Sequence, residues 1–140
     1  MLRDERRNKV IRKKVDLSLW KEIKYFKKQE FACPCCGECK MEMGFVSWLD
    51  EIRSIYGKPI VITSGYRCEK HNFEVGGVPD SAHLKGLAAD IRVHSDEERY
   101  ELVKIMLRHG AFRIGVGRTF IHVDFDVKKP RPRLWVYGNK

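Results

Sequence analysis

Two histidines and one aspartate in this sequence have the side chains that a catalytic metal site needs. His83 ends a long glycine-containing stretch, Asp90 lies in the apolar run that follows, and His122 lies in a later apolar run. A catalytic zinc ion usually takes three protein ligands from histidine and carboxylate side chains and leaves a fourth position for water. A hydrogen-bonded or surface role fits each histidine alone, whereas an unpaired carboxylate within an apolar strand is costly to bury.

The three residues depend on two predicted strands for their positions. In residues 87–93, alternation places Asp90 on the face opposite Ala89 and Ile91. Residues 112–116 and 119–125 predict an antiparallel hairpin, and a folded sheet could bring His122 of this hairpin alongside Asp90. Gly86 allows a tight turn between His83 and Asp90.

Two predicted helices flank these strands. Residues 41–56 carry apolar side chains at helical spacing, and Gly57 ends this helix. Ser95 and Glu98 form a capping box at the start of a second helix, which Gly110 ends. The expected buried stripe of the second helix comprises Tyr100, Val103, Met106 and Leu107.

The remaining segments complete a single domain. We expect a short helix over residues 17–28, a buried strand over 59–63, an edge strand over 134–137, and an irregular loop from 65 to 86. A loop of this length is usually functional. The fold class is therefore α+β, with an antiparallel sheet, flanking helices and a basic N-terminal arm over residues 1–16.

Composition limits the classes of partner. The chain has 140 residues, which favours one domain, and it contains no apolar run of the roughly 18 residues that span a membrane. The charged N-terminus lacks the apolar stretch of a signal peptide, so we expect synthesis in the cytoplasm. A net charge of +9 favours anionic partners, including cell-wall polymers, although a solvated basic surface explains it equally. No basic helix carries interleaved aromatic residues, so no specific nucleic-acid partner is expected.

Three segments resemble zinc D-Ala-D-Ala carboxypeptidases and murein endopeptidases, a group that includes phage endolysin peptidase domains and shares its fold with the Hedgehog signalling domain. They are residues 63–67 (TSGYR), 81–90 (SAHLKGLAAD) and 121–124 (IHVD), and the likeness extends from about Phe31 to Tyr137. The resemblance implies that residues 17–140 form a zinc metallopeptidase domain that hydrolyses peptide bonds in peptidoglycan stem peptides. It also implies a monomer that acts on the cell wall after release, and leaves carboxypeptidase and endopeptidase activity equally open.

The resemblance assigns roles to five residues. His83, Asp90 and His122 match the zinc ligands. Arg67 matches an arginine that holds a substrate carboxylate, for which a guanidinium is a planar fork; a salt bridge that braces the loop is the alternative. Ser81 matches a substrate-binding serine, and a local cap bond is the alternative.

The general base departs from the pattern of some relatives. They carry glutamate three residues before the last histidine ligand, where this sequence has Thr119. Asp124 shares a strand face with His122 and is the catalytic candidate, either as the base or as a carboxylate that orients a ligand. Without that glutamate, a zinc-containing binding domain that does not hydrolyse its ligand remains the alternative function.

Cysteines form a second candidate site. Four of the five lie between Cys33 and Cys39 in two overlapping Cys-x-x-Cys pairs. This spacing suits thiolate coordination of zinc, so Cys33, Cys36, Cys39 and Cys68 are expected as ligands of a structural metal. Free thiols or one disulfide are the alternatives.

Overall fold

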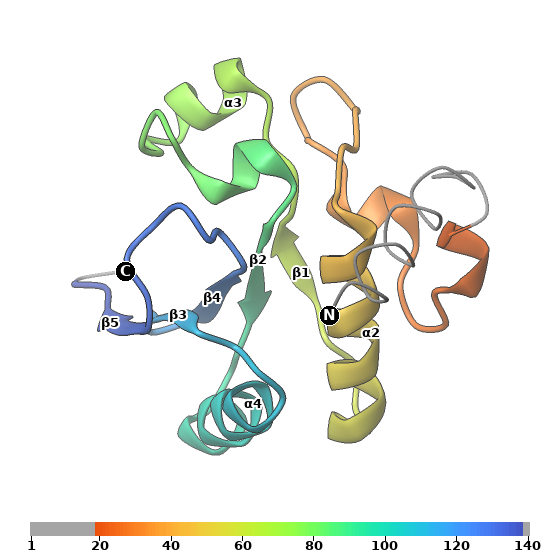
Figure 1. The fold of residues 1–140 in the computed structure, drawn as a ribbon, viewed down its shortest axis with the longest axis vertical. Coiled ribbons are helices and arrows are strands. Elements are labelled where there is room, and N and C mark those ends of the chain that lie inside the picture. The colour runs from red at the N-terminus through yellow and green to blue at the C-terminus, as the bar shows by residue number, and fades with distance from the viewer. Residues whose placement is uncertain (1–18, 139–140) are drawn as a thin grey trace, which may run out of the picture.

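Five short strands form one sheet in the order β1-β2-β4-β3-β5 (Figure 1). The structure is a computed structural model that describes residues 19–138. The predicted arm over residues 1–16 lies outside the described residues. The strands are β1 (Ile62–Ser64), β2 (Ala88–Arg92), β3 (Arg113–Val116), β4 (Phe120–Asp124) and β5 (Arg133–Val136). The first four strands pair antiparallel and β5 pairs parallel with β3, which confirms the α+β class and the edge strand.

The paired strands β2 and β4 carry apolar side chains on one face of the sheet and polar side chains on the other. Ala89 pairs with Val123, Asp90 with His122, and Ile91 with Ile121. Because side chains alternate along a strand, the apolar pairs face the core and the Asp90–His122 pair faces the other way. This register places two of the predicted zinc ligands directly opposite each other.

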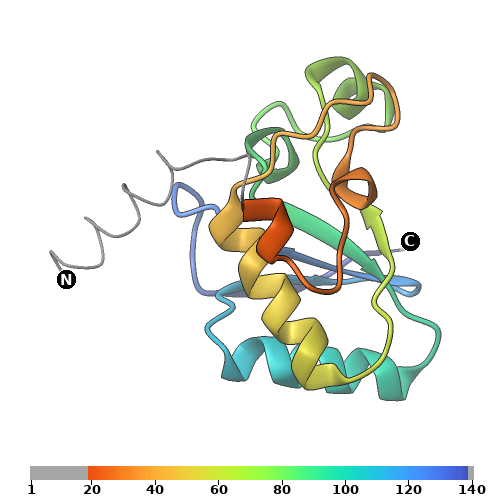
Figure 2. The same ribbon diagram turned by 90° about the vertical axis from the view of Figure 1, so that its right-hand side faces the viewer.

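Two long helices cover the apolar face of the sheet. They are α2 (Met43–Tyr56) and α4 (Asp96–Arg108), and the C-terminal end of α2 lies beside α4 (Figure 2). The buried side chains of these helices are Phe45, Val46, Leu49, Ile52, Leu102 and Met106. Gly57 ends α2 with a positive φ of 75°, and the Ser95 hydroxyl accepts a hydrogen bond from the Glu98 N–H, as the sequence predicted.

The buried stripe predicted for α4 was partly wrong. Met106 is buried, but Tyr100 is 65% exposed and Leu107 is 50% exposed. Leu102 takes the core position instead. The helix packs against the core through the side that carries Leu102 and Met106. Apolar residues also lie on its other sides, so the sequence did not indicate which side is buried.

The predicted helix over residues 17–28 was too long. Residues 19–22 are helical, and a separate 3-10 helix, η1, covers Lys28–Phe31. Between them, the Asp50 carboxylate accepts hydrogen bonds from the N–H groups of Lys24 and Tyr25. These bonds satisfy the backbone there without an uninterrupted helix.

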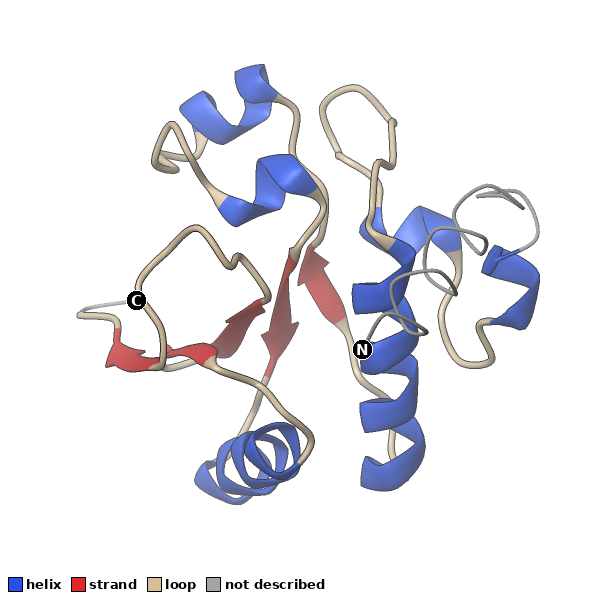
Figure 3. Cartoon of the chain, viewed as in Figure 1, coloured by secondary structure: helices blue, strands red, loops and turns tan. Residues whose placement is uncertain are grey.

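The other corrections concern the chain before and after β1. The strand predicted over residues 59–63 is shifted to Ile62–Ser64 and lies at the sheet edge, half exposed, so only Ile60 before it is buried. The predicted irregular loop contains two short helices, α3 (Glu69–Glu74) and η2 (Ala82–Lys85), which Figure 3 shows between β1 and β2. Cys68 and Ser81 cap them by accepting backbone hydrogen bonds. Within residues 19–138, no helix has the length and apolar character needed to cross a membrane.

Candidate metal centre

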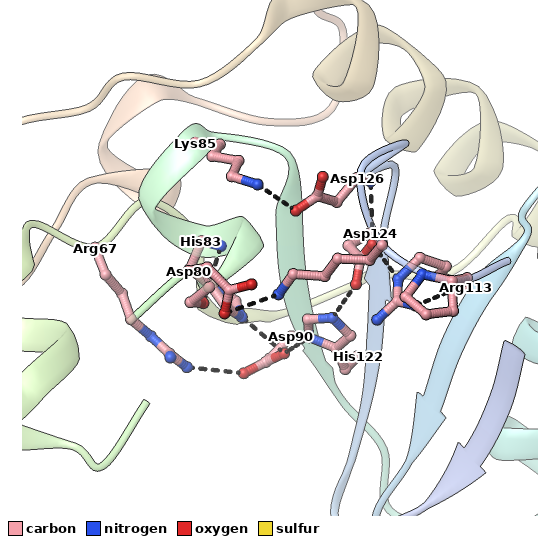
Figure 4. A network of polar contacts seen from close by, with 12 residues as sticks. Arg67, Asp80, His83, Lys85, Asp90, Arg113, His122, Asp124 and Asp126 are labelled. Carbon is pink, nitrogen blue, oxygen red and sulfur yellow. Dashed lines mark hydrogen bonds and ion pairs between the residues drawn. The ribbon is translucent and has the colours of Figure 1, made fainter. Parts of the chain in front are cut away.

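Three polar side chains converge on the polar face of the sheet (Figure 4). Asp90 comes from β2, His122 from β4 and His83 from η2, and one potential ligand atom from each lies within 4.8 Å of the other two. The Asp90 Oδ1 atom is 2.9 Å from His122 Nδ1 and 3.3 Å from His83 Nε2. The structure therefore brings together the three residues predicted as zinc ligands.

His83 is fixed by the backbone of the segment that follows β1. Its Nδ1 lies 2.7 Å from the Gly65 carbonyl oxygen, and because a carbonyl only accepts, Nδ1 carries the proton. The Nε2 lone pair is then free to face Asp90 and His122. The turn that follows needs a glycine, since Gly86 has a φ of 71° and a Cβ there would overlap the Lys40 carbonyl.

His122 is oriented by Asp124. The His122 Nε2 donates to Asp124 Oδ2 at 2.7 Å, which leaves Nδ1 directed at the cluster. Asp124 is 1% exposed and its other oxygen accepts from Arg113 Nε at 2.9 Å and from the Asp126 N–H. The Asp124 carboxylate thus lies behind the imidazole ring, on the nitrogen that points away from Asp90. A carboxylate in this position holds a metal-binding histidine in one tautomer.

The charges of these groups follow from their contacts. Burial acts to raise the pKa of Asp90, but the close approach of the His122 and His83 rings outweighs it and holds the pKa well below its ordinary value. Burial likewise acts to raise the pKa of Asp124, and His122 and Arg113 bring it below its ordinary value. Burial acts to lower the pKa of His122, whereas Asp124 and Asp90 raise it above the ordinary value. The site therefore holds two ionised carboxylates at neutral pH, and each has an arginine neighbour, Arg67 beside Asp90 and Arg113 beside Asp124.

Arg67 reaches the edge of the cluster from the segment before α3. Its Nη2 lies 3.4 Å from Asp90 Oδ2, while Nε donates to Ser64 Oγ at 3.1 Å and Nη1 donates to Asn72 Oδ1 at 3.3 Å. These contacts hold the guanidinium plane beside the three predicted ligands. The contacts with Ser64 and Asn72 are those expected if Arg67 braces the loop. The position beside Asp90 is the one that binding of a substrate carboxylate would require.

Ser81 caps the helical turn that carries His83. Its hydroxyl accepts from the His83 N–H at 3.2 Å, and its side chain is buried. This is the local cap bond that the sequence left open as an alternative to substrate binding.

Sequence reasoning missed the residues that support the site from behind. Asn72 is 3% exposed and donates to the Val78 carbonyl while accepting from Arg67. Asp126 is 1% exposed and pairs with Lys85 at 2.7 Å. The Arg113 guanidinium lies 4.9 Å from the centre of the Trp135 ring. Asn72 lies in α3 and its burial is tolerated because both groups of its amide have partners, which no apolar pattern in the sequence indicates.

The cysteines are divided between two environments. Cys33, Cys36 and Cys68 bring their sulfur atoms within 4.8 Å of one another, whereas Cys39 packs against the hydrophobic core. Burial acts to raise the pKa of the Cys33 thiol, but N–H groups of Cys68, Cys36 and Cys35 stabilise its thiolate and lower the pKa to about 7. Burial and the neighbouring Cys68 raise the pKa of the Cys35 thiol.

Comparison with protein families identifies the class to which this chain belongs. The Peptidase M15 family model matches residues 24–124, so the chain belongs to the Peptidase M15 family, the zinc D-Ala-D-Ala carboxypeptidase family. The matched segment contains all three residues of the cluster and Arg67. A search of curated proteins finds no match.

The cluster fits the zinc ion that this family uses. Its donor set is two imidazole nitrogens and one carboxylate oxygen, a set found in catalytic zinc sites. Ligand atoms about 2.0–2.1 Å from one tetrahedral ion lie roughly 3.3 Å from one another. The Asp90 Oδ1 separations of 2.9 and 3.3 Å are close to that spacing, and both histidine tautomers leave the required lone pair.

Proposed function

We propose that residues 17–140 form a zinc peptidase domain that hydrolyses peptide bonds in the stem peptides of bacterial peptidoglycan. Membership of a zinc peptidase family and the convergence of His83, Asp90 and His122 are the observations that carry the proposal. The net charge of +9 suits an anionic cell-wall polymer. The protein acts as a monomer on the wall after release from the cytoplasm.

The three ligands would hold the zinc ion, which when bound supplies a Lewis acid for the scissile carbonyl and lowers the pKa of water. Asp90 supplies the negative charge of the ligand set, and its carboxylate stays ionised because of its two histidine neighbours. In their neutral forms His83 and His122 would each present one nitrogen lone pair, since their other nitrogens donate to Gly65 and Asp124.

Arg67 binds a carboxylate of the stem peptide. Its guanidinium is held by Ser64 and Asn72 and lies at the edge of the cluster, so little ordering is needed when substrate binds. A surface depression of about 530 Å³, lined by Asp90, Ser64 and Thr119 among others, reaches one of the three proposed ligands and is where we place the peptide. Ser81 acts by positioning His83 through its cap bond.

Asp124 acts as a positioning residue. Both of its oxygens are engaged, by His122 on one side and by Arg113 and the Asp126 N–H on the other. A general base must reach the proton that it removes. Asp124 reaches the His122 nitrogen that faces away from the cluster, so its geometry supports orientation of the ligand over proton transfer from metal-bound water.

The same observation favours a second candidate, a zinc-containing binding domain without hydrolysis. Thr119 occupies the position of the glutamate found in some relatives, and Asp124 lies behind His122. Such a domain would bind stem peptides through Arg67 and release no product.

Digestion of purified peptidoglycan separates the two candidates. Mass spectrometry should detect new peptide fragments with the zinc-loaded protein, none after chelation, and the same fragments after zinc is restored. The masses also distinguish loss of a terminal D-amino acid from cleavage of a crosslink. Zinc-loaded protein that co-sediments with peptidoglycan and releases nothing would establish the binding domain instead.

A further inference from the structure

A turn rich in cysteine lies against the segment that carries Arg67. The Tyr66 N–H donates to the Phe31 carbonyl at 2.8 Å, which joins the start of the cysteine turn to the residues after β1. Cys68, directly after Arg67, then approaches the turn, and its sulfur is 3.7 Å from that of Cys33. The cluster defined by Cys33, Cys36 and Cys68 is therefore built from two segments far apart in sequence.

The turn over residues 33–37 has a defined backbone. The Gly37 N–H donates to the Cys33 carbonyl at 2.8 Å, and the Cys33 N–H donates to the Glu38 carbonyl at 2.7 Å. Gly37 has a φ of 76°, which favours glycine. This closed turn directs the side chains of Cys33 and Cys36 toward Cys68, with all three sulfur atoms within 4.8 Å of one another.

Backbone N–H groups also face the sulfur atoms. The Cys68 N–H lies 3.5 Å from the Cys33 sulfur, and the His71 N–H lies 3.4 Å from the Cys68 sulfur. Donors in these positions stabilise the negative charge of thiolates, the form in which cysteine binds metals. The cluster thus has sulfur ligands at metal-binding separations and hydrogen bonds that suit their charged form.

We propose that Cys33, Cys36 and Cys68 bind a second, structural zinc ion, separate from the His83, Asp90 and His122 site. Zinc takes four ligands in structural sites, so one position remains for solvent or for the neighbouring thiol of Cys35. Cys39, which the sequence predicted as a fourth ligand, is left out of this site because its side chain packs against the core. This inference does not depend on the proposed hydrolysis.

The position of the cluster indicates what this ion does. It ties the chain before α2 to Cys68, the residue between Arg67 and α3. Gly65, whose carbonyl accepts from His83, lies in the same short segment. The second zinc ion therefore anchors the segment that positions Arg67 and His83.

Cobalt substitution of the reduced full-length chain tests this site by its spectrum. His83→Ala removes a ligand of the first site, so the second can be observed alone. This variant should bind one cobalt ion and show sulfur-to-cobalt charge-transfer absorption in the near ultraviolet. Adding Cys36→Ser or Cys68→Ser should abolish that absorption, whereas adding Cys39→Ser should preserve it.

Cys36 is exposed, so Cys36→Ser should keep the native circular dichroism spectrum and separate loss of metal from loss of fold. The proposal is overturned if reduced protein shows no sulfur-to-cobalt absorption, if the absorption survives Cys36→Ser, or if Cys39→Ser removes it equally. It is also overturned if Cys33 and Cys68 are recovered as a disulfide in native protein prepared without added oxidant.

Discussion

The histidine–aspartate cluster and the cysteine cluster are built from different kinds of local structure. Asp90 and His122 occupy paired positions on adjacent strands, so the register of the sheet fixes their separation. Cys33 and Cys36 lie in one turn, and their approach to Cys68 depends on how that turn packs against the segment after β1.

The two clusters also differ in what surrounds their ligands. His83, His122 and Asp90 each have a hydrogen-bond partner besides one another: Gly65, Asp124 and Arg67 respectively. Cys36 is exposed, and Cys33 and Cys68 are held by backbone N–H groups. A metal site with such outer contacts is pre-organised for chemistry, whereas a thiolate site in a turn fits a structural role.

The largest effect is expected from removing a ligand of the first cluster. His122→Ala leaves two ligands, so one zinc ion per chain should be lost and peptidoglycan hydrolysis should fall to background. Elemental analysis and product release measure these two results, with His109→Ala at the end of α4 as the control. Retention of both zinc and hydrolysis in His122→Ala would show that the chemistry lies elsewhere.

Asp124→Asn tests whether the outer contact of His122 matters. An orienting carboxylate contributes about 10- to 100-fold to zinc affinity. We therefore expect weaker zinc binding, with kcat at saturating zinc near that of the wild type. The exposed Asp96→Asn is the control.

A general base would give the opposite pattern in Asp124→Asn. Zinc affinity would be unchanged and kcat at saturating zinc would fall by ~100- to 10,000-fold. That outcome would restore Asp124 as the catalytic group, and unchanged affinity with unchanged kcat would remove both roles.

Arg67→Ala should lower kcat/KM and leave zinc in place. Loss of one charged hydrogen bond costs ~1.5–3 kcal/mol, or roughly ten- to hundredfold. Arg108→Ala, at the exposed end of α4, is the matched control. A lower melting temperature with unchanged kcat/KM would assign Arg67 to bracing the loop alone.

The smallest effect on hydrolysis is expected from a substitution at Gly65. This residue contacts His83 through its carbonyl and packs against Phe31, at the start of the cysteine turn. A Cβ there would lie 2.7 Å from the Phe31 Cα and 2.8 Å from its carbonyl oxygen, and backbone cannot move aside easily. Gly65→Ala should lower the free energy of unfolding by ~1–3 kcal/mol, as overpacking does.

Gly44→Ala is the matched control for this stability measurement. No atom lies within 4 Å of a Cβ at that position in α2, so alanine should stabilise the protein by ~0.5–1 kcal/mol. Equal denaturation midpoints for the two variants would contradict the tight packing between the cysteine turn and the Gly65 segment.

The clusters show which features could be predicted from sequence. Strand alternation placed Asp90 and His122 on one face, and the motif supplied His83 as their partner. The behaviour of Cys39 could not be predicted, because Cys-x-x-Cys spacing does not indicate which side of a turn faces a distant Cys68. For Asp124, alternation predicted that it shares a strand face with His122. It did not predict the contact with Arg113, which holds the carboxylate at the His122 nitrogen that faces away from Asp90.

Two helices in the loop before β2 were also missed for a physical reason. Both α3 and η2 are short and are stabilised by caps from Cys68 and Ser81 and by the buried Asn72, which are contacts that apolar periodicity does not record. The helix α2 and the strand β4 were predicted because their apolar residues follow one spacing throughout each element.

The central claim is that His83, Asp90 and His122 bind the zinc ion of a peptidase. Anomalous X-ray diffraction at the zinc edge, from crystals of the zinc-loaded protein, tests it most directly. The account predicts a peak among these three side chains, with Zn–N and Zn–O distances of about 2.0–2.2 Å, separate from any peak at the cysteine cluster. A fully loaded crystal with zinc at the cysteines and no peak between His83, Asp90 and His122 would contradict it.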